Sequence, residues 1–268
     1  TPLVMPGPKL DGENLFNLLD AQKVYSSWGV PTVWLGLLAE MKKRGRKPEG
    51  FSELIVGGSA APRAMIETFE RDYGVNVVHA WGMTEMSPIG TFLRLPPDKQ
   101  KLPFEERMDI KVRQGQRLFG VEFKLVDDEG RRQPHDGDTQ GELYVRGPAI
   151  ISGYYKNEIA SKQAFDNEGW FGTGDVAKID PDGYVQLTDR SKDVIKSGGE
   201  WISSIDLENA AVAHPAVAMA AVIGVKHPRW DERPLMFIVR KPGQELSKQQ
   251  VLDFLSERVA KWWLPDEV

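Results

Sequence analysis

The sequence contains no cysteine among its 268 residues. This absence excludes a disulfide-stapled scaffold, and it excludes zinc or iron–sulfur sites built on thiolates. Cysteine-free composition fits a reducing compartment, and we therefore expect a cytoplasmic protein.

Long apolar runs and an excess of positive charge are also absent. No run of about 18 apolar residues occurs, so no transmembrane segment is predicted, and no signal peptide is visible. The net charge of −5 argues against a nucleic-acid partner. The four histidines are scattered and show no metal-ligand spacing. With 41% hydrophobic residues, the chain can still bury the core of one large or two smaller domains.

The first part of the chain alternates between helix and strand patterns. A helix is predicted from Pro31 to Gly45, because proline suits a first helical turn and glycine ends one. A strand over 51–56, a helix over 62–74 and a strand over 75–78 follow. Strand, helix and strand at this spacing predict a parallel crossover unit.

The pattern changes from about residue 115. Residues 121–127 and 141–147 alternate polar and apolar side chains with period two, as strands do. The sequence Asp-Pro-Asp-Gly at 180–183 predicts a turn between two strands, since Pro presets φ and Gly accepts positive φ. This region is expected to be an antiparallel sheet or small barrel.

A third pattern begins near residue 190 and predicts a small α+β domain. Helix starts are predicted by two capping pairs, Ser203 with Asp206 and Ser247 with Gln250. Strands are expected over 217–225 and 235–240. The last helix should turn one apolar face inward, formed by Val251, Phe254, Leu255, Val259 and Trp262. We expect a large domain over 1–189 and a small mobile domain over 190–268.

Two loops follow neighbouring predicted parallel strands, over 57–62 and 79–85. In open α/β sheets, ligands bind at this edge. The small side chains of the first loop would let a flat ring lie close, and Trp81 offers an aromatic face for its other side. Thr84 supplies a hydroxyl for phosphate oxygens, and Glu85 is the hard oxygen ligand that Mg²⁺ prefers. The alternative is that both loops are ordinary turns.

Two further stretches suggest nucleotide chemistry. Asp175 follows two glycines and would accept the hydroxyls of a ribose, although it is equally suited to capping a hairpin turn. Arg190 would grip phosphate or ribose oxygens, and Gly198-Gly199 permits close approach of a ligand. The alternative for residues 189–200 is a charged linker between domains.

The five stretches together, in this order, resemble a known family, although no single stretch does so by itself. In sequence they read GGSAAP at 57–62, WGMTE at 81–85, GELYVRG at 141–147, WFGTGD at 170–175 and DRSKDVIKSGGE at 189–200. This set resembles the adenylate-forming superfamily of acyl-CoA synthetases, peptide-synthetase adenylation domains and luciferases. The stretch HAWGMTEMSP at 79–88 is most similar to fatty-acyl-CoA synthetases. The resemblance implies part of a large α/β domain with an antiparallel sub-barrel, followed by a small α+β domain.

The resemblance also implies roles for individual residues. The adenine-binding set would be Gly58, Ser59, Ala60, Ala61, Trp81 and Gly82, with Trp81 at a position that is usually Tyr. Thr84 would contact phosphate, Glu85 would bind Mg²⁺, and Asp175 and Arg190 would bind ribose and phosphate. Lys192 would be the hinge residue. The loop that swings toward the thiol channel would comprise Lys196, Gly198, Gly199 and Glu200. Of these, Thr84, Glu85, Arg190 and Lys196 would act in catalysis.

The implied reaction has two halves and uses ATP, Mg²⁺ and coenzyme A. A fatty or related carboxylic acid attacks ATP and gives acyl-AMP and pyrophosphate, and the coenzyme A thiol then displaces AMP. The family's phosphate loop and terminal lysine would lie outside these 268 residues. We therefore expect that this chain alone adenylates nothing.

Several alternatives remain open at this level. The chain would instead be a nucleotide-binding module without turnover, an adenylation domain that loads a carrier protein, or an interaction fragment with a closed pocket. A homodimer is left open, and acyl chain length is unreadable. Val33, Trp34, Leu37 and Leu38 are expected to pack in a core rather than line an acyl pocket. His79 is expected to have a packing role.

Overall fold

The computed structural model describes residues 2–268, which divide into two compact units. The N-terminal unit comprises Thr1–Phe123, Arg146–Gln163 and Ile179–Gln186. The C-terminal unit comprises Lys124–Val145, Ala164–Lys178 and Leu187–Val268. These units divide the chain differently from the expected boundary after residue 189, which stays a prediction. No helix in residues 2–268 is long and apolar enough to cross a membrane.

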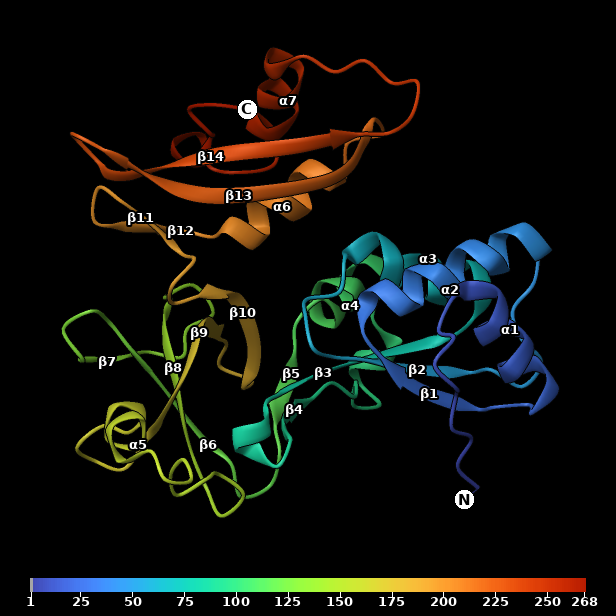
Figure 1. The fold of residues 1–268 in the computed structure, drawn as a ribbon, viewed down its shortest axis with the longest axis horizontal. Helices are drawn as coiled ribbons and strands as arrows, with labels where there is room; N and C mark the ends of the chain where they lie inside the picture. Colours follow the sequence, from blue (N-terminus) through green and yellow to red (C-terminus); the bar gives the residue numbers. More distant parts are fainter. Residues whose placement is uncertain (1) are drawn as a thin grey trace. The chain divides into compact units, whose positions relative to one another are not determined.

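The N-terminal unit begins as a parallel crossover fold. Its first three strands pair in parallel and in sequence order, β1 (Ser26–Gly29), β2 (Glu53–Val56) and β3 (Asn76–Gly82). Helices α1 (Gly12–Ala21), α2 (Pro31–Arg44), α3 (Arg63–Tyr73) and α4 (Phe104–Lys111) gather beside this sheet (Figure 1). The predicted parallel crossover is confirmed.

The predicted helix ends are confirmed by backbone geometry. Gly45 and Gly74 follow α2 and α3 in the left-handed conformation, with φ of 68° and 60°. Glycine adopts this conformation without a steric penalty. The indole Nε1 of Trp34 donates to the Ile55 carbonyl oxygen at 3.2 Å, which ties α2 to β2.

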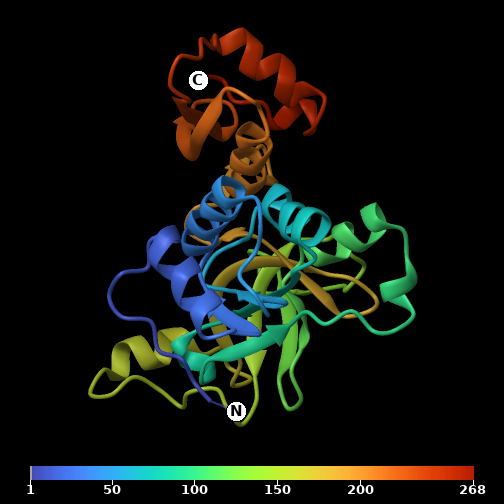
Figure 2. The same ribbon diagram turned by 90° about the vertical axis from the view of Figure 1, so that its right-hand side faces the viewer.

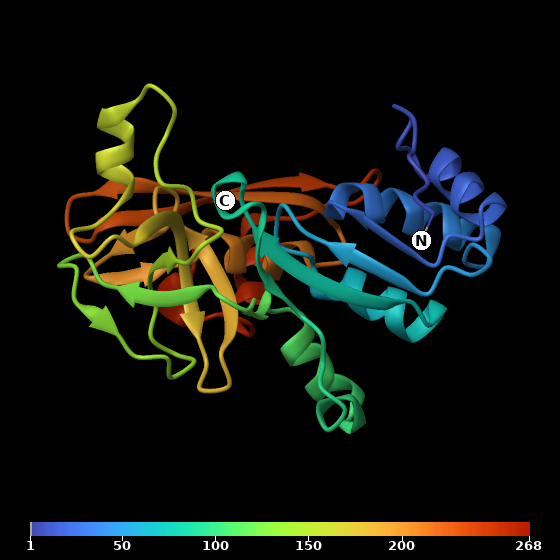
Figure 3. The ribbon, with the colours of Figure 1, turned by 90° about the horizontal axis from the view of Figure 1, so that it is seen from below.

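The two faces of this sheet bury different side chains. Alternate strand residues such as Leu54 and Val77 join the core beneath the helices, which also contains Trp34, Leu37 and Leu38, with Val33 packed against it. The expected core role of these α2 residues is confirmed. The intervening residues Ile55, Val78 and Ala80 form a separate cluster with Phe92, on the face viewed in Figure 3.

The sheet of the N-terminal unit continues with antiparallel strands. Its order is β1-β2-β3-β4-β5-β10, with β4 (Ile89–Phe92), β5 (Gly115–Arg117) and the first residues of β10 (Tyr184–Arg190). From Leu187 on, β10 belongs to the C-terminal unit. The Asp180–Gly183 turn before β10 is confirmed, since Gly183 N donates to the Asp180 carbonyl at 2.8 Å with φ of 84°. Shorter elements are η1 (Thr84–Met86), η2 (Lys99–Lys101) and α5 (Glu158–Ala164).

One strand of this unit is longer than the sequence predicts. We expected a strand over 75–78 followed by a loop, but β3 runs to Gly82. Its second half pairs antiparallel with β4, with Trp81 opposite Thr91. The ladder to β4 fixes residues that have no strand pattern of their own, so tertiary pairing overrides the local signal.

The C-terminal unit contains an antiparallel segment and a separate small sheet. The segment has the order β9-β8-β6-β7, with β6 (Glu122–Val126), β7 (Arg132–Gln133), β8 (Gly141–Arg146) and β9 (Phe171–Ile179). The second sheet has the order β12-β11-β14-β13, with β11 (Ile195–Ser197), β12 (Glu200–Ile202), β13 (Val217–His227) and β14 (Asp231–Arg240).

Two helices, α6 (Ser204–Val212) and α7 (Lys248–Ser256), complete the C-terminal unit (Figure 2). Both predicted capping pairs are confirmed: Ser203 accepts from Asp206 N at 3.0 Å, and Ser247 forms a capping box with Gln250. The helices share one core with the small sheet, which includes Leu207, Ala211, Val222, Met236, Val251 and Leu255.

The expected apolar face of the last helix is only partly correct. Val251 and Leu255 are buried, but α7 ends at Ser256, so Val259 and Trp262 lie beyond it. Trp262 belongs to η3 (Lys261–Trp263) and is 44% exposed. The chain turns after α7 because Val259 and Trp263 then pack against the same core.

Candidate active site

The loop after β2 and the turn after β3 lie at the same edge of the parallel sheet. Val56, the last residue of β2, pairs with His79, and β3 runs three residues further to Gly82 before its turn. In open α/β sheets, this carboxyl edge is where ligands bind. Both elements belong to the N-terminal unit, and their relative placement is therefore set by strand pairing.

The loop after β2 needs its glycines for space and for backbone conformation. A Cβ on Gly57 would lie 3.2 Å from the Ala80 carbonyl oxygen, and Gly58 has φ of 81°. Gly58 and Ser59 are exposed, Ala60 is half-buried, and Ala61 is buried in the core under α3. Residues 58–60 therefore present the accessible part of the predicted adenine loop, while Ala61 anchors it.

Trp81 lies within a strand and is buried, where the sequence predicted a loop. The side chain is 8% exposed, and its ring meets that of Phe123 edge-on with centroids 6.1 Å apart. A Cβ on Gly90 would approach the indole to 2.8 Å, so Trp81 fills its site closely. Stacking of Trp81 on adenine stays a prediction.

The turn after β3 carries Thr84 and Glu85. Gly82 enters it where a Cβ would lie 2.0 Å from the Pro88 carbonyl oxygen, so only glycine fits. Thr84 is exposed and Glu85 is half-buried. An exposed hydroxyl thus lies next in sequence to a half-buried carboxylate. Their phosphate and metal contacts stay predictions.

Tyr154 contacts the predicted metal residue Glu85, and the sequence analysis did not identify it. Its hydroxyl donates to Glu85 Oε1 at 3.1 Å, and the nearby Ile151 N donates to the Glu85 carbonyl oxygen at 2.9 Å. Burial, and then the Glu85 carboxylate, raise the pKa of Tyr154. The loop after β8 therefore holds Glu85 through two hydrogen bonds, although it is distant in sequence. Nothing local marks Tyr154, because the two residues are 69 positions apart.

His79 supports the turn from inside the protein. It is 1% exposed, and burial lowers its pKa to about 4, against the opposite influence of the backbone of Ser59, Arg113 and Val112. A neutral buried imidazole fits the expected packing role.

Asp175 and Arg190 meet in the C-terminal unit. Arg190 Nε lies 2.9 Å from Asp175 Oδ1, and Ser191 N donates to the Gly174 carbonyl at 2.9 Å. Asp175 is 3% exposed on β9, whereas the Arg190 side chain is 52% exposed at the end of β10. Gly174 has φ of 72°, a conformation that favours glycine. Two residues predicted to share one ligand are therefore in direct contact.

The predicted thiol-side loop is a β-hairpin. Lys196 pairs with Trp201 and Ser197 with Glu200, while Gly198 and Gly199 form the turn with φ of 63° and 87°. A two-residue turn with both φ values positive suits a hairpin and favours glycine. Lys192 is exposed in the turn just after β10.

The Lys196 side chain makes a surface ion pair. Its Nζ lies 2.6 Å from Asp128 Oδ1, and both side chains are near half exposure. Exposed pairs of this kind contribute roughly 0–1 kcal/mol, so Lys196 can leave Asp128 at little cost.

The prediction that Glu85 binds Mg²⁺ stays a prediction. Among residues 2–268, no group of three His, Asp or Glu side chains is placed to hold a metal. One carboxylate fits Mg²⁺ nevertheless, because protein-bound Mg²⁺ usually takes one or two carboxylates together with substrate phosphates.

Comparison with known proteins decides the family. Residues 1–155 match the model of the AMP-binding enzyme family, and residues 206–268 match the AMP-binding enzyme C-terminal domain. The chain belongs to the AMP-binding enzyme family. The resemblance drawn from the sequence is confirmed.

Relatives of this AMP-binding enzyme chain include two bacterial CoA ligases. It is 53% identical over 267 residues to 3-methylmercaptopropionyl-CoA ligase of Ruegeria lacuscaerulensis, covering 99% of this chain and 49% of the relative. It is 46% identical to medium-chain-fatty-acid–CoA ligase of Ectopseudomonas oleovorans, covering 98% of this chain and 48% of the relative. The chain spans about half the length of the curated relatives it matches.

Solved structures confirm the fold class. o-Succinylbenzoate CoA synthetase of Bacillus subtilis, in complex with its acyl-adenylate intermediate, matches with a TM-score of 0.80 and 29% identity. The match covers 96% of this chain and 50% of that protein. A structure of the same enzyme with ATP and magnesium ion matches with a TM-score of 0.79.

Proposed function

We propose that this chain forms the nucleotide- and thiol-handling part of an AMP-forming acyl-CoA synthetase. The observation that carries the proposal is the placement of the Gly57–Pro62 loop and the Thr84–Glu85 turn at one edge of β2 and β3. The relatives named above are CoA ligases, which supports the same reaction class. The substrate would be a fatty or related carboxylic acid.

In the first half-reaction, a carboxylate oxygen attacks the α-phosphorus of ATP and the bond to pyrophosphate breaks. The exposed loop at residues 58–60 and Trp81 would hold adenine, and Asp175 would accept hydrogen bonds from the ribose. The Thr84 hydroxyl and the Arg190 guanidinium would donate to phosphate oxygens, where charge develops. Bound Mg²⁺, held by Glu85, would neutralise phosphate charge.

In the second half-reaction, the thiol sulfur of coenzyme A attacks the acyl carbon and AMP leaves. The β11–β12 hairpin would serve this step, with Gly198 and Gly199 allowing close approach of the thiol arm. Lys192 would act as the hinge, since it lies in an exposed turn next to Arg190. Closing over acyl-AMP would keep water from the mixed anhydride.

The proposal is tested by supplying the intermediate directly. The 268-residue chain is mixed with hexanoyl-AMP and coenzyme A, and hexanoyl-CoA is measured by mass spectrometry against an enzyme-free blank. Thioester formation above the blank supports a CoA ligase. Transfer only to a pantetheine-loaded carrier protein would indicate an adenylation domain. Tight AMP binding without any transfer would indicate a nucleotide-binding module.

A further inference from the structure

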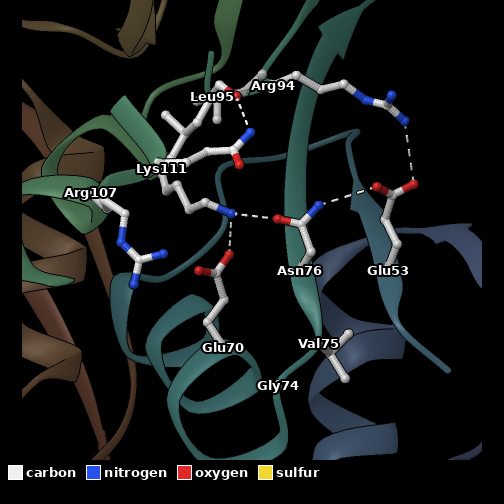
Figure 4. A pocket seen from close by; sticks show the side chains of 11 residues that line it. Glu53, Glu70, Gly74, Val75, Asn76, Arg94, Leu95, Arg107 and Lys111 are labelled. Atoms are coloured by element: carbon white, nitrogen blue, oxygen red, sulfur yellow. Dashed lines mark hydrogen bonds and ion pairs between the residues drawn. The ribbon is translucent and has the colours of Figure 1, made fainter. Parts of the chain in front are cut away.

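A hollow of about 500 Å³ lies at the other end of the parallel strands. Its walls include the first residues of β2 and β3, the end of α3, the segment after β4 and one face of α4 (Figure 4). β3 has seven residues, so at about 3.3 Å per residue its two ends are roughly 20 Å apart. The hollow is therefore separate from the candidate adenine and Thr84–Glu85 elements.

Lys111 is the buried cation of this hollow, at 5% exposed. Its ammonium donates to the Glu70 carboxylate, to Asn76 Oδ1 at 2.7 Å and to the Val77 carbonyl at 3.1 Å. An ammonium has three hydrogens to donate, so these contacts use all of them.

Both carboxylates of the hollow are also engaged. Glu70 accepts from Val77 N at 3.0 Å in addition to Lys111. Glu53 accepts from Asn76 Nδ2 at 3.1 Å, and the Arg94 guanidinium lies 3.7 Å from its other oxygen. Figure 4 shows this chain of contacts running from Glu70 to Arg94.

Arg107 differs from the other charged side chains of the hollow, because they have partners of opposite charge. Among the described residues it makes no ion pair, and its Nε is buried without a hydrogen-bond acceptor. Its guanidinium contacts the Phe104 ring, 5.6 Å from the centroid. Arg107 lies one helical turn before Lys111 on α4, so the two cations are neighbours. The lining of the hollow has one positive charge in excess. It contains three cationic side chains, Arg94, Arg107 and Lys111, and two carboxylates, Glu53 and Glu70.

We propose that this hollow binds a small carboxylate monoanion through Arg107. Arg107 lines the hollow without an ion-pair partner among the described residues, and a carboxylate matches the planar fork of its guanidinium. One negative charge balances the excess of one positive charge. Val75, Leu93 and Leu95 form the apolar part of the wall, and Leu95, at 9% exposed, is the most accessible of the three to a short hydrocarbon tail.

The positive charge of Arg107 also acts on Lys111. Burial lowers the pKa of Lys111, the charge and hydrogen bond of Glu70 oppose this, and Arg107 acts in the same direction as burial. A carboxylate bound to Arg107 would offset its repulsion of the Lys111 ammonium.

The test is a titration of butyrate into the isotopically labelled 268-residue chain, followed by amide NMR at constant ionic strength. We expect saturable shifts confined to amides near residues 74–77, 93–95 and 107–111. Arg107→Gln should weaken binding at least about tenfold, a factor that equals roughly 1.4 kcal/mol. The butyrate affinity of Arg107→Lys should lie between those of the parent and Arg107→Gln, because lysine keeps the positive charge but lacks the planar guanidinium.

The control is Arg71→Gln, which removes an exposed arginine of α3 that is paired with Glu105 at 2.7 Å. It should bind butyrate like the parent. Absence of saturable shifts up to about 50 mM, far above the millimolar range of weak ligands, would overturn the proposal. Unchanged binding by folded Arg107→Gln would overturn it too. Tighter binding of inorganic phosphate than of butyrate would contradict the carboxylate assignment.

Discussion

Arg190 Nε lies 2.9 Å from Asp175 Oδ1, so two residues expected to meet the same nucleotide are paired before it arrives. The Asp175 carboxylate is buried on β9, and the Arg190 guanidinium is half exposed on β10. The pair thus holds the carboxylate in place and leaves the guanidinium within reach of solvent and ligand. A nucleotide would share or replace this contact.

A double-mutant cycle measures this relationship. We expect Arg190→Gln to lower the free energy of unfolding by about 1–2 kcal/mol, because Asp175 is buried while water screens Arg190. In an Asp175→Asn background, Arg190→Gln should cost about 1 kcal/mol less, which is the coupling between the two. Urea unfolding of the four proteins gives the numbers. Strict additivity would show that the contact contributes nothing to stability.

Tyr154 and Glu85 provide a second pair that can be tested by titration. A neighbouring carboxylate disfavours the phenolate, so Glu85→Gln should lower the pKa of Tyr154. The pKa should stay above its ordinary value, because burial is the larger cause. Carbon-13 NMR of the tyrosine rings follows the change, with Tyr154→Phe assigning the signal.

The matched control is Glu122→Gln, which removes a surface carboxylate paired with Arg146 in the same unit. It should leave the Tyr154 titration unchanged. An equal shift in both variants would mean that general charge, and not the 3.1 Å hydrogen bond, sets the pKa.

Replacing Gly82 or Gly36 with alanine should change the free energy of unfolding in opposite directions. Gly82→Ala places a Cβ 2.0 Å from the Pro88 carbonyl oxygen, which forces the backbone apart and should cost several kcal/mol, roughly 2–4. Gly36→Ala, within α2, would bring its Cβ to 3.6 Å from the Gly12 nitrogen, an ordinary contact, and should stabilise by about 0.5–1 kcal/mol. Thermal unfolding of both variants checks the pair. A neutral Gly82→Ala would contradict the tight turn described here.

His79 should make stability depend on pH. Its folded pKa of about 4 lies below the ordinary 6.5, so between these values the unfolded chain binds a proton that the folded chain does not. The contribution is complete above pH 6.5 and is lost as the pH falls toward 4. It amounts to about 3 kcal/mol at most.

The measurement is the difference in unfolding free energy between the parent and His79→Asn across this pH range. Subtraction removes the effect of other titrating groups, such as Asp189 and Glu208, whose pKa values are raised by burial. The parent should lose stability more steeply on acidification. His135→Gln, at an exposed position, should follow the parent. Parallel curves for parent and His79→Asn would contradict a neutral buried imidazole.

Local signals predicted the parts of the fold that depend on local chemistry. The ends of α2 and α3 at Gly45 and Gly74 and the two capping pairs were readable, because each follows from a few adjacent residues. The ordered loops likewise identified the family. Their individual ligand roles stay predictions.

Long-range contacts could not be predicted in the same way. The extension of β3 depends on pairing with β4, and the burial of Trp81 depends on Phe123. α4 was not anticipated, since its buried Lys111 breaks an apolar pattern and is compensated by Glu70, 41 residues away. In each case the interacting residue is distant in sequence, so no local pattern predicts the contact.

The central claim, that these residues hold the adenosine half of an acyl-adenylate site, is tested most directly by calorimetry. AMP and a non-hydrolysable acyl-AMP mimic are titrated into the parent, into Asp175→Asn and into the surface control Asp253→Asn. The account predicts binding to the parent and control, with at least about tenfold weaker binding to Asp175→Asn, since a ribose acceptor worth roughly 1.4 kcal/mol or more is lost. Equal binding to all three, or no binding to the folded parent, would contradict it.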